Sequence, residues 1–481
     1  MKLSTLLSGV AIPPADIEIT NILSDSRKSV DQGTLFVCLR GMTFDAHNAV
    51  PDLVSRGVGA VVVDRDCGIA NQIVVADTRE ALCKIWANFY LNPQKALKFI
   101  GVTGTNGKTT TTTVMKNMLM SMGIKSGLIG TCNNEIGEEI IPAERTTPEP
   151  DELFALLRRM ADAKCEYVVM EVSSQGMSQK RLEGIEFDLA VFTNLTQDHL
   201  DVHGNMENYY QAKKLLFERC KQALINIDDE WGKRLYSEIT CQKKSFSLNE
   251  KADYFADGIK LLPHISSYWY SNGEKTFKAA VRLPGMYNVS NTLAVLGGLE
   301  MLGFSPNLLV PFISAVEGVK GRCEVVETGR DFTVVIDYAH TPDAIENILR
   351  NVRETATGRI VCLFGCGGNR DAKKRPLMAK AAADYADFLV VTSDNPRNEN
   401  PHEIITDILA GLPEGYKSYI EIDDRREAIF RAIKNAQPND VIVLAGKGHE
   451  DYQVLANNEK IHFDEREVVA AALSELEKED K

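Results

Sequence analysis

The 481-residue sequence lacks any long hydrophobic run, since no stretch approaches the ~18 consecutive apolar residues of a membrane-spanning helix. The apolar stretch from Leu3 to Ile12 is broken by Ser and Thr and is too polar for a secretory signal peptide. The ten cysteines form no C-x-x-C pair, which favours reduced thiols over a disulfide framework. We therefore expect a cytoplasmic protein with no membrane insertion.

Basic residues are also in deficit, because 54 Lys and Arg stand against 67 Asp and Glu, a net charge of −13. This balance argues against nucleic acid or an anionic membrane as the main partner, although a local basic pocket for phosphates is compatible with it. The chain contains no internal repeat and no low-complexity tract. A hydrophobic content of 44% is typical of globular proteins, and at one domain per roughly 150 residues the length suggests three domains.

A glycine-rich turn joins an apolar β-like run, 97–103, to a helical stretch that starts near Thr109. In such a turn backbone N–H groups point at phosphate oxygens, a lysine neutralises charge and a threonine hydroxyl can ligate Mg²⁺. Val102 stands where the strict G-x-x-x-x-G-K-[ST] spacing has glycine, so the segment could be a tight turn that happens to carry a lysine. The order of strand, turn and helix favours a phosphate-binding loop, made of Gly104, Thr105, Asn106, Gly107, Lys108, Thr109 and Thr110.

Apolar, β-branched runs alternate with helical stretches over most of the chain, as buried parallel strands do. The expected strands are 34–39, 60–63, 73–75, 97–103, 167–172, 189–194, 333–337, 360–364, 388–392 and 441–444, with helices at 79–90 and from about Asn288. A more polar region, 245–283, could be an antiparallel excursion. We predict an α/β protein of three domains: 1–96, a central P-loop ATPase domain at 97–325, and a doubly wound, Rossmann-like domain at 326–481.

Two polar segments follow central strands, where an open α/β sheet binds its ligands. Glu171 ends one strand and His199 lies in the segment 196–203 beyond the next, so both are candidate Mg²⁺ neighbours, directly or through water. By spacing alone, this second segment could equally be a solvated loop. Lys213, taken alone, indicates only a surface lysine on a helix.

Four polar loops follow strands of the C-terminal part. Asp337 ends the first strand, where its carboxylate could bind a ribose hydroxyl or cap the helix that Thr341-Pro342 begins. The other three loops are Gly365–Asp371, Asp394–Arg397 and Gly446–Glu450, with arginine in two of them and glutamate in the third. If they converge at one edge of a sheet, they could bind both ends of a zwitterion.

Six motifs together resemble those of the Mur ligases, and the match spans nearly the whole chain. They are Gly104–Thr109, Glu171–Ser174, Asn194–Asp201, Gly285–Asn288, Gly321-Arg322 and Asp337–His340. The resemblance implies three domains that bind a UDP-muramoyl substrate, ATP and an incoming amino acid, and ATP-dependent amide ligation through an acyl phosphate in peptidoglycan precursor synthesis. Asp25-Ser-Arg27 and Phe44–Asn48 are similar to the UDP-binding segment of members that extend a UDP-N-acetylmuramoyl dipeptide. A monomer acting on small molecules is expected.

The resemblance also implies roles for single residues. Lys108, Lys213 and His199 would be catalytic, and Thr109, Glu171, His199 and Lys213 would lie at Mg²⁺ sites. Lys213 matches a lysine that the family carries as a CO₂-derived carbamate, an anion able to ligate a second Mg²⁺. Asn288 would contact adenine, and Arg322 and Asp337 would complete the nucleotide site from the domain junction. The UDP-muramoyl dipeptide would be held by Ser26, His47, Thr146, Thr147, Ser173 and Arg181.

The segment Asp394-Asn-Pro-Arg397 is similar to the signature of members that add meso-diaminopimelate. Arg397 would bind the distal carboxylate, which lysine lacks, within a pocket formed with Arg370, Asp394, Asn395, Gly446 and Glu450. An arginine left without its carboxylate would cost about 2 to 5 kcal/mol, enough to reject lysine strongly. L-Lysine stays the alternative substrate, because the family tolerates exceptions to this motif.

Two rival functions are weighed against this one. Another amide ligase, such as a folylpolyglutamate synthetase, is disfavoured by Asp25–Arg27 and by Asp394–Arg397. A non-catalytic, ATP-binding regulatory protein is disfavoured because the metal-site residues and the amino-acid loops are all present. Two residues depart from the family pattern: Gln175 follows the Ser-Ser pair where histidine is usual, and Asn369 replaces a common aspartate before Arg370.

Overall fold

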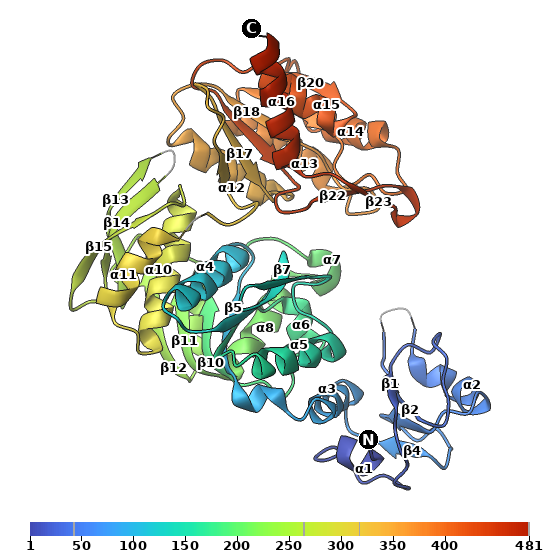
Figure 1. The fold of residues 1–481 in the computed structure, drawn as a ribbon. Coiled ribbons are helices and arrows are strands. Elements are labelled where there is room, and N and C mark those ends of the chain that lie inside the picture. Colours follow the sequence, from blue (N-terminus) through green and yellow to red (C-terminus); the bar gives the residue numbers. More distant parts are fainter. Residues whose placement is uncertain (42–43, 263–264, 317, 480–481) are drawn as a thin grey trace.

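The computed structural model describes residues 1–41, 44–262, 265–316 and 318–479. Three sheets, each flanked by helices, follow one another along an elongated molecule, with the N-terminal sheet at one end and the C-terminal sheet at the other (Figure 1). The predicted α/β class with three domains is confirmed, whereas the boundaries themselves stay predictions. Within the described residues no helix is both long and apolar enough to cross a membrane.

The N-terminal sheet has four parallel strands in the order β1-β2-β3-β4. Its elements are α1 (Leu3–Leu6), β1 (Asn21–Leu23), β2 (Thr34–Val37), η1 (Ala46–Ala49), α2 (Val50–Ser55), β3 (Ala60–Val63), β4 (Gln72–Val74), α3 (Thr78–Phe89) and η2 (Pro93–Ala96). The strands β2 and β3 are buried at every residue, because α1 and α3 cover one face of the sheet and α2 the other. Helix α3 also packs on the central domain, since Cys83 joins the core there.

The central sheet has eleven strands in the order β15-β14-β13-β12-β11-β10-β5-β9-β6-β7-β8. Its strands are β5 (Lys98–Thr103), β6 (Ser126–Ile129), β7 (Asn133–Ile136), β8 (Glu139–Pro142), β9 (Tyr167–Glu171), β10 (Phe187–Phe192), β11 (Cys220–Asn226), β12 (Gln242–Ser247), β13 (Tyr254–Leu262), β14 (Ile265–Ser271) and β15 (Thr276–Val281). Strands β13 to β15 pair antiparallel, which confirms the predicted excursion, although β12 pairs parallel with both neighbours.

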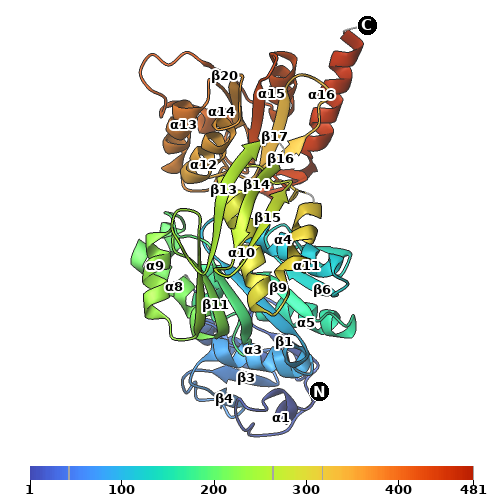
Figure 2. The same cartoon turned by 90° about the vertical axis from the view of Figure 1, so that its left-hand side faces the viewer.

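Helices cover both faces of the central sheet (Figure 2). They are α4 (Lys108–Ser121), α5 (Pro150–Asp162), α6 (Ser174–Ser178), α7 (Leu200–His203), α8 (Met206–Lys214), η3 (Leu215–Glu218), α9 (Glu230–Glu238), α10 (Met286–Met301) and α11 (Pro306–Ala315). One core cluster joins the sheet to α4, α10 and α11, and the other joins it to α5, α8 and α9. The polar turns at the strand ends therefore lie outside both cores.

The C-terminal sheet has the order β16-β17-β21-β18-β19-β20 and is parallel except for β16. The elements of this part of the chain are β16 (Glu324–Val326), β17 (Thr333–Asp337), α12 (Pro342–Arg353), β18 (Ile360–Phe364), α13 (Lys374–Tyr385), β19 (Phe388–Thr392), α14 (Pro401–Leu409), β20 (Tyr419–Ile422), α15 (Arg425–Lys434), β21 (Val441–Ala445), β22 (Tyr452–Val454), η4 (Ala456–Asn458), β23 (Lys460–His462) and α16 (Glu465–Glu479). β22 and β23 form a separate antiparallel pair. Helices α12 to α14 cover one face, and α15 and α16 cover the other. The four strands predicted here are confirmed.

The carboxyl ends of strands in the central and C-terminal sheets meet at the junction of the two domains. Asn106, in the turn after β5, donates from Nδ2 to Oδ2 of Asp343 in the first turn of α12 at 2.9 Å. Because ligands of open α/β sheets bind at strand carboxyl ends, this junction is the place to look for a site.

Candidate active site

The predicted phosphate-binding loop has the geometry of a turn that only glycine can make. Gly107 caps α4 with φ +85°, and a Cβ there would lie 2.3 Å from Oδ1 of Asn291. The Lys108 Nζ donates to the carbonyl oxygens of Gly104 at 3.0 Å and Thr105 at 2.8 Å, so its cation lies inside the turn. Burial lowers the pKa of Lys108. A phosphate entering this turn would meet a lysine that is already desolvated.

The end of β10 holds this turn in place. Thr193 Oγ1 donates to the backbone oxygen of Asn106 at 2.6 Å, and Asn194 Oδ1 accepts from the Asn106 N–H at 2.9 Å. A Cβ at Gly104 would come 1.9 Å from the Thr193 hydroxyl. The two residues after β10 therefore fix the loop conformation, a role that sequence analysis did not assign to them.

Glu171 is the centre of a buried polar cluster beside the loop. Its side chain is 1% exposed, and its Oε1 accepts from the Thr109 hydroxyl at 3.0 Å and from the Thr131 N–H at 2.9 Å. The Thr131 hydroxyl donates to Oε2 at 3.0 Å and lies 2.9 Å from the Thr146 hydroxyl. Sequence analysis missed Thr131, which stands two residues after β6, because it did not predict that strand and so had no strand end there to search.

The residues predicted to hold the muramoyl dipeptide lie next to this cluster. Thr147 Oγ1 donates to the backbone oxygen of Glu171 at 3.0 Å and accepts from the Ser173 N–H at 3.0 Å. Arg181 Nη1 donates to the Thr147 carbonyl at 2.9 Å, and its Nη2 pairs with Glu149 at 2.7 Å. The structure thus brings Thr146, Thr147, Ser173 and Arg181 together around Glu171. Gln175 lies nearby on α6 and is partly buried.

Ser26 lies in a different place, on the wall of a cavity of about 690 Å³ between the N-terminal and central domains. Glu149, which pairs with Arg181, also lines this cavity, so the cavity borders the residues around Glu171. His47 is buried in the N-terminal domain, where Nδ1 contacts Asp45 at 2.6 Å and Nε2 accepts from the Asp64 N–H at 3.2 Å. Both ring nitrogens are therefore engaged, and substrate binding by His47 stays a prediction.

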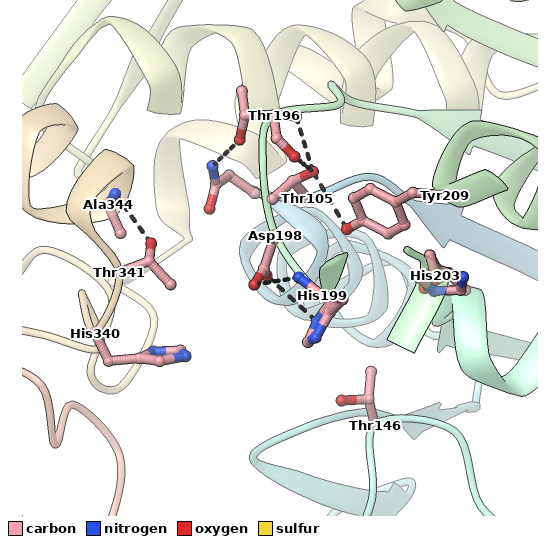
Figure 3. A network of polar contacts seen from close by, with 12 residues as sticks. Thr105, Thr146, Thr196, Asp198, His199, His203, Tyr209, His340, Thr341 and Ala344 are labelled. Carbon is pink, nitrogen blue, oxygen red and sulfur yellow. Dashed lines mark hydrogen bonds and ion pairs between the residues drawn. The ribbon is translucent and has the colours of Figure 1, made fainter. Parts of the chain in front are cut away.

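Lys213 is buried, at 2% exposure, so the interpretation of it as a surface lysine is wrong. Its Nζ donates to the Gly104 carbonyl at 2.7 Å and lies 4.7 Å from the centre of the Tyr209 ring. Burial, followed by the nearby Lys108 charge, holds the pKa of Lys213 well below its usual range. The Tyr209 hydroxyl lies 3.3 Å from Thr105 Oγ1 (Figure 3), so Tyr209 connects Lys213 with the phosphate-binding turn.

His199 lies on the loop after β10, with a left-handed φ of +52°. Its Nε2 is 3.3 Å from Asp198 Oδ2, and its side chain is 55% exposed. Figure 3 shows His199 and Asp198 in the space between the loop, Tyr209 and His340 of the C-terminal domain. The solvated-loop alternative thus describes the environment of His199, and its role at a metal stays a prediction.

Arg322 lies two residues before β16 of the C-terminal sheet, although the predicted boundary at 325 assigns it to the central domain. Its Nη2 donates to Thr109 Oγ1 at 3.1 Å, so the segment that leads into the C-terminal sheet reaches the P-loop. Asp337 accepts from the Cys323 N–H at 2.7 Å, and burial raises the pKa of its carboxyl. Thr341, not Asp337, caps α12, since its hydroxyl accepts from the Ala344 N–H at 3.2 Å (Figure 3). The helix-cap alternative for Asp337 is therefore wrong.

Asn288 is buried in the first turn of α10, and its Nδ2 donates to the Pro284 carbonyl at 2.9 Å. Asn291 donates to Asn288 Oδ1 at 3.3 Å and lies against Gly107. The two asparagines therefore back the P-loop, and an adenine contact of Asn288 stays a prediction.

The three polar loops of the C-terminal domain converge at one edge of its sheet. Gly368 N–H donates to the Asn395 carbonyl at 2.9 Å, and Arg397 Nη1 donates to the Gly368 carbonyl at 3.0 Å. Asn395 Nδ2 donates to Glu450 Oε2 at 3.0 Å. Gly446, which follows β21, opens the third loop with φ +117°. The convergence predicted for a zwitterion site is therefore present.

Two residues of the first of these loops, Asn369 and Arg370, are exposed to solvent. The Arg370 Nη1 is 3.5 Å from the Asn369 carbonyl. Asn369 has a left-handed φ of +53°, which asparagine tolerates well, and its Oδ1 accepts from the Asn398 N–H at 3.1 Å. Asparagine at position 369, where the family commonly has aspartate, therefore still accepts a hydrogen bond from the Asn398 backbone. Sequence analysis also missed Lys447, which is fully buried among these loops.

Comparison with known proteins agrees with this geometry. The model of the Mur ligase middle domain matches residues 102–299, and that of the Mur ligase, glutamate ligase domain, matches residues 321–448. A protein of Syntrophomonas wolfei named UDP-N-acetylmuramoyl-L-alanyl-D-glutamate--2,6-diaminopimelate ligase is 43% identical over 98% of this chain and 99% of its own length. A Clostridium acetobutylicum protein of the same name is 44% identical over 96% of each chain.

Solved structures give the same result. A structure of a UDP-N-acetylmuramoyl-L-alanyl-D-glutamate--2,6-diaminopimelate ligase superposes with a TM-score of 0.69, at 33% identity and with 95% of each chain covered. The Mycobacterium tuberculosis folylpolyglutamate synthase superposes with a TM-score of 0.63, over 82% of this chain and 94% of its own, but at 15% identity it shows the shared fold alone. The chain belongs to the Mur ligase family.

Proposed function

We propose that this protein uses ATP to join meso-diaminopimelate to UDP-N-acetylmuramoyl-L-alanyl-D-glutamate, as a step of peptidoglycan precursor synthesis. The observation that carries the proposal is the position of Glu171. Its buried carboxylate accepts from Thr109 of the P-loop and, on the other side, connects through Thr131 to Thr146 of the dipeptide segment. Nucleotide and dipeptide would therefore meet at one carboxylate. The proposal places the protein in the cytoplasm, as a monomer.

The chemistry must activate a carboxylate, which is a poor electrophile. The side-chain carboxylate of the D-glutamyl group would attack the γ-phosphate of ATP, and ADP would leave. The amine of the incoming amino acid would then attack the acyl phosphate through a tetrahedral intermediate and release inorganic phosphate. The work of the protein is to position the reactants and neutralise charge, for which Lys108 and Arg322 lie at the P-loop.

The residues at the loop fit Mg²⁺ shared with phosphate. Magnesium is commonly bound through one or two carboxylates together with substrate phosphates and water. Thr109 Oγ1 and Glu171 Oε1 are 3.0 Å apart and supply oxygen ligands at the loop. Among the described side chains no group of three or more His, Cys, Asp or Glu could hold a metal unaided. Bound there, Mg²⁺ would neutralise charge that develops on the transferred phosphate.

The environment of Lys213 fits a carbamate. CO₂ reacts with a neutral amine, and burial favours the neutral form of Lys213 by lowering its pKa. A carbamate nitrogen keeps one N–H, which can preserve the hydrogen bond to the Gly104 carbonyl. The added carboxylate would place an anion beside the lysine of the P-loop and supply oxygen ligands for a second Mg²⁺.

The amino-acid pocket supports diaminopimelate over lysine. Arg397 and Glu450 lie on neighbouring loops that Asn395 connects, because Arg397 Nη1 contacts the Asn395 carbonyl at 3.4 Å and Asn395 Nδ2 donates to Glu450. A guanidinium and a carboxylate on neighbouring loops suit the distal carboxylate and ammonium of diaminopimelate. L-Lysine has no distal carboxylate for Arg397.

The test is phosphate release by the purified protein with ATP, Mg²⁺ and the UDP-muramoyl dipeptide, with added meso-diaminopimelate or L-lysine. We expect release only with diaminopimelate, and loss of this preference in Arg397→Gln. Arg350→Gln, which changes an exposed arginine that pairs with Glu346 on the surface of α12, is the matched control. Equal release with lysine would discard the role of Arg397 and keep the ligase, whereas ATP binding without release in any mixture would favour the non-catalytic alternative.

A further inference from the structure

Lys447 is a fully buried lysine whose partners all lie in the loops of the amino-acid pocket. It stands two residues after β21 and is 0% exposed. Its Nζ lies 2.9 Å from Glu450 Oε2, 3.2 Å from Asn395 Oδ1 and 3.6 Å from Asp394 Oδ1. A buried ammonium persists only where such acceptors surround it, and buried carboxylates in turn need the cation.

Lys447 helps to determine which way the Asn395 amide points, together with the backbone N–H of Val454. Asn395 Oδ1 accepts from Lys447 Nζ and from the Val454 N–H at 2.9 Å, while Asn395 Nδ2 donates to Glu450. A flipped amide would place its NH₂ group against these two donors and its oxygen against a carboxylate. The observed orientation is therefore fixed, with the amide oxygen towards Lys447 and the NH₂ group towards Glu450.

The charges of the cluster do not cancel. Asp394 and Glu450 contribute two carboxylates and Lys447 one ammonium, so this side of the pocket keeps one net negative charge. Asp394 Oδ1 is buried and has no hydrogen bond among the described residues; it faces the Lys447 ammonium at 3.6 Å, so it can still accept a hydrogen bond from a donor. A ligand with an ammonium on this side and a carboxylate at Arg397 would neutralise both the negative charge of the cluster and the positive charge of Arg397.

We infer that Lys447 is a positioning residue of the amino-acid pocket, which orients the Asn395 amide and the Glu450 carboxylate towards the distal ammonium of the incoming amino acid. The inference rests on the proposed function. A different residue, Arg425, supports the fold beneath these loops, because it donates to the carbonyls of Ser393 and Ala445.

The test compares steady-state kinetics of the wild type with Lys447→Met, which has a similar length and no charge. We expect the KM for diaminopimelate to rise about tenfold or more, because Asn395 and Glu450 lose the cation that orients them. The KM for ATP should stay within about twofold of wild type, since the hydrogen bonds and ion pairs of the Lys447 ammonium go to Asp394, Asn395 and Glu450 and not to the P-loop. Lys380→Met, which removes an exposed lysine paired with Asp384 in the same domain, should change neither constant.

A charge-balanced double variant keeps the test decisive if Lys447→Met folds poorly. Lys447→Met/Glu450→Gln removes one charge of each sign, so it should melt closer to the wild type than Lys447→Met does, while its KM for diaminopimelate stays raised. A wild-type KM for diaminopimelate in either variant, or a parallel rise in the KM for ATP, overturns the inference. Wild-type protein that releases no phosphate with diaminopimelate contradicts the proposed function instead.

Discussion

Arg322 Nη2 donates to Thr109 Oγ1 at 3.1 Å, although 213 residues separate them in the chain. Thr109 in turn donates to Glu171, and the Arg322 guanidinium lies 4.9 Å from the centre of the Tyr338 ring. A cation from the domain junction thus reaches the hydroxyl that would lie beside the phosphates. With ATP bound at the P-loop as proposed, the nucleotide site would include a residue from the domain junction, so the position of the C-terminal domain would affect phosphate chemistry as well as amino-acid binding.

Replacing Arg322 with glutamine should reduce kcat/KM for ATP by about ten- to a hundredfold, since a charged hydrogen bond contributes about 1.5 to 3 kcal/mol. The measurement is phosphate release as a function of ATP concentration. Arg353→Gln serves as the control, because Arg353 pairs with Asp387 on the exposed surface of the same domain. An equal loss in both variants would mean that any arginine of this domain affects the assay, and the assignment of Arg322 would fail.

Gly107→Ala should weaken ATP binding by about tenfold or more, because the added Cβ would meet Oδ1 of Asn291 in addition to the strain of a positive φ, which costs about 1 to 3 kcal/mol. Gly123 provides a matched control, since it has φ +79° and open space around its Cβ position. Gly123→Ala should lose stability and keep its ATP affinity, as isothermal calorimetry can measure. Unchanged ATP affinity in Gly107→Ala would show that the turn tolerates a side chain.

How well sequence analysis predicted the strands depended on their burial. The strands 333–337, 360–364 and 388–392 were predicted to the residue, because parallel strands covered on both faces form continuous apolar runs. β7 and β8 were missed, since β8 is exposed along most of its length and β7 alternates between partly buried and buried residues. β6 was missed although all four of its residues are buried, because Ser126 and Gly127 leave only two apolar residues in its sequence. Short strands of this kind carry little apolar pattern, so only pairing with a neighbour defines them.

The burial of two lysines, Lys213 and Lys447, could not be predicted from the residues around them in the sequence. Lys213 and Lys214 are adjacent in one helix, but only Lys213 is buried, because Tyr209 and the Gly104 carbonyl, 109 residues away, enclose it. No periodicity in the helix distinguishes the two, and only the family resemblance singled out Lys213. Lys447 was missed for a similar reason: a polar loop residue in sequence becomes a buried cation once three loops meet.

Arg425→Met should destabilise the C-terminal domain by about 3 to 5 kcal/mol, because it leaves the fully buried Glu465 carboxylate without its cation. Urea unfolding, followed by a probe in this domain, measures the loss. Arg426→Met is the control at the next position, where the arginine is exposed and lies over the Phe430 ring. If Arg425→Met/Glu465→Gln is as unstable as Arg425→Met, the unpaired charge is not the cause.

Because of His449, the free energy of unfolding should decrease as the pH falls. Burial, followed by the charges of Arg322, Lys320, Arg466 and Lys447, lowers the pKa of His449 from 6.5 to about 3. Between these values the unfolded chain binds a proton that the folded protein does not, so stability falls as the pH decreases, by at most about 1.4 kcal/mol per pH unit from this group. His449→Phe keeps a ring against Tyr338, 4.8 Å away in the native protein, and should reduce that slope.

The measurement is the urea midpoint of the C-terminal domain at pH 4.5 and pH 6.5 in the wild type and in His449→Phe. His462→Gln is the opposite control, because the exposed His462 has a pKa raised by Glu467. A raised pKa stabilises the fold at low pH and loses that contribution as the pH rises through it, so His462→Gln should steepen the loss on acidification. An identical pH slope in the wild type and His449→Phe would show that His449 takes up its proton as readily in the folded protein as in the unfolded chain.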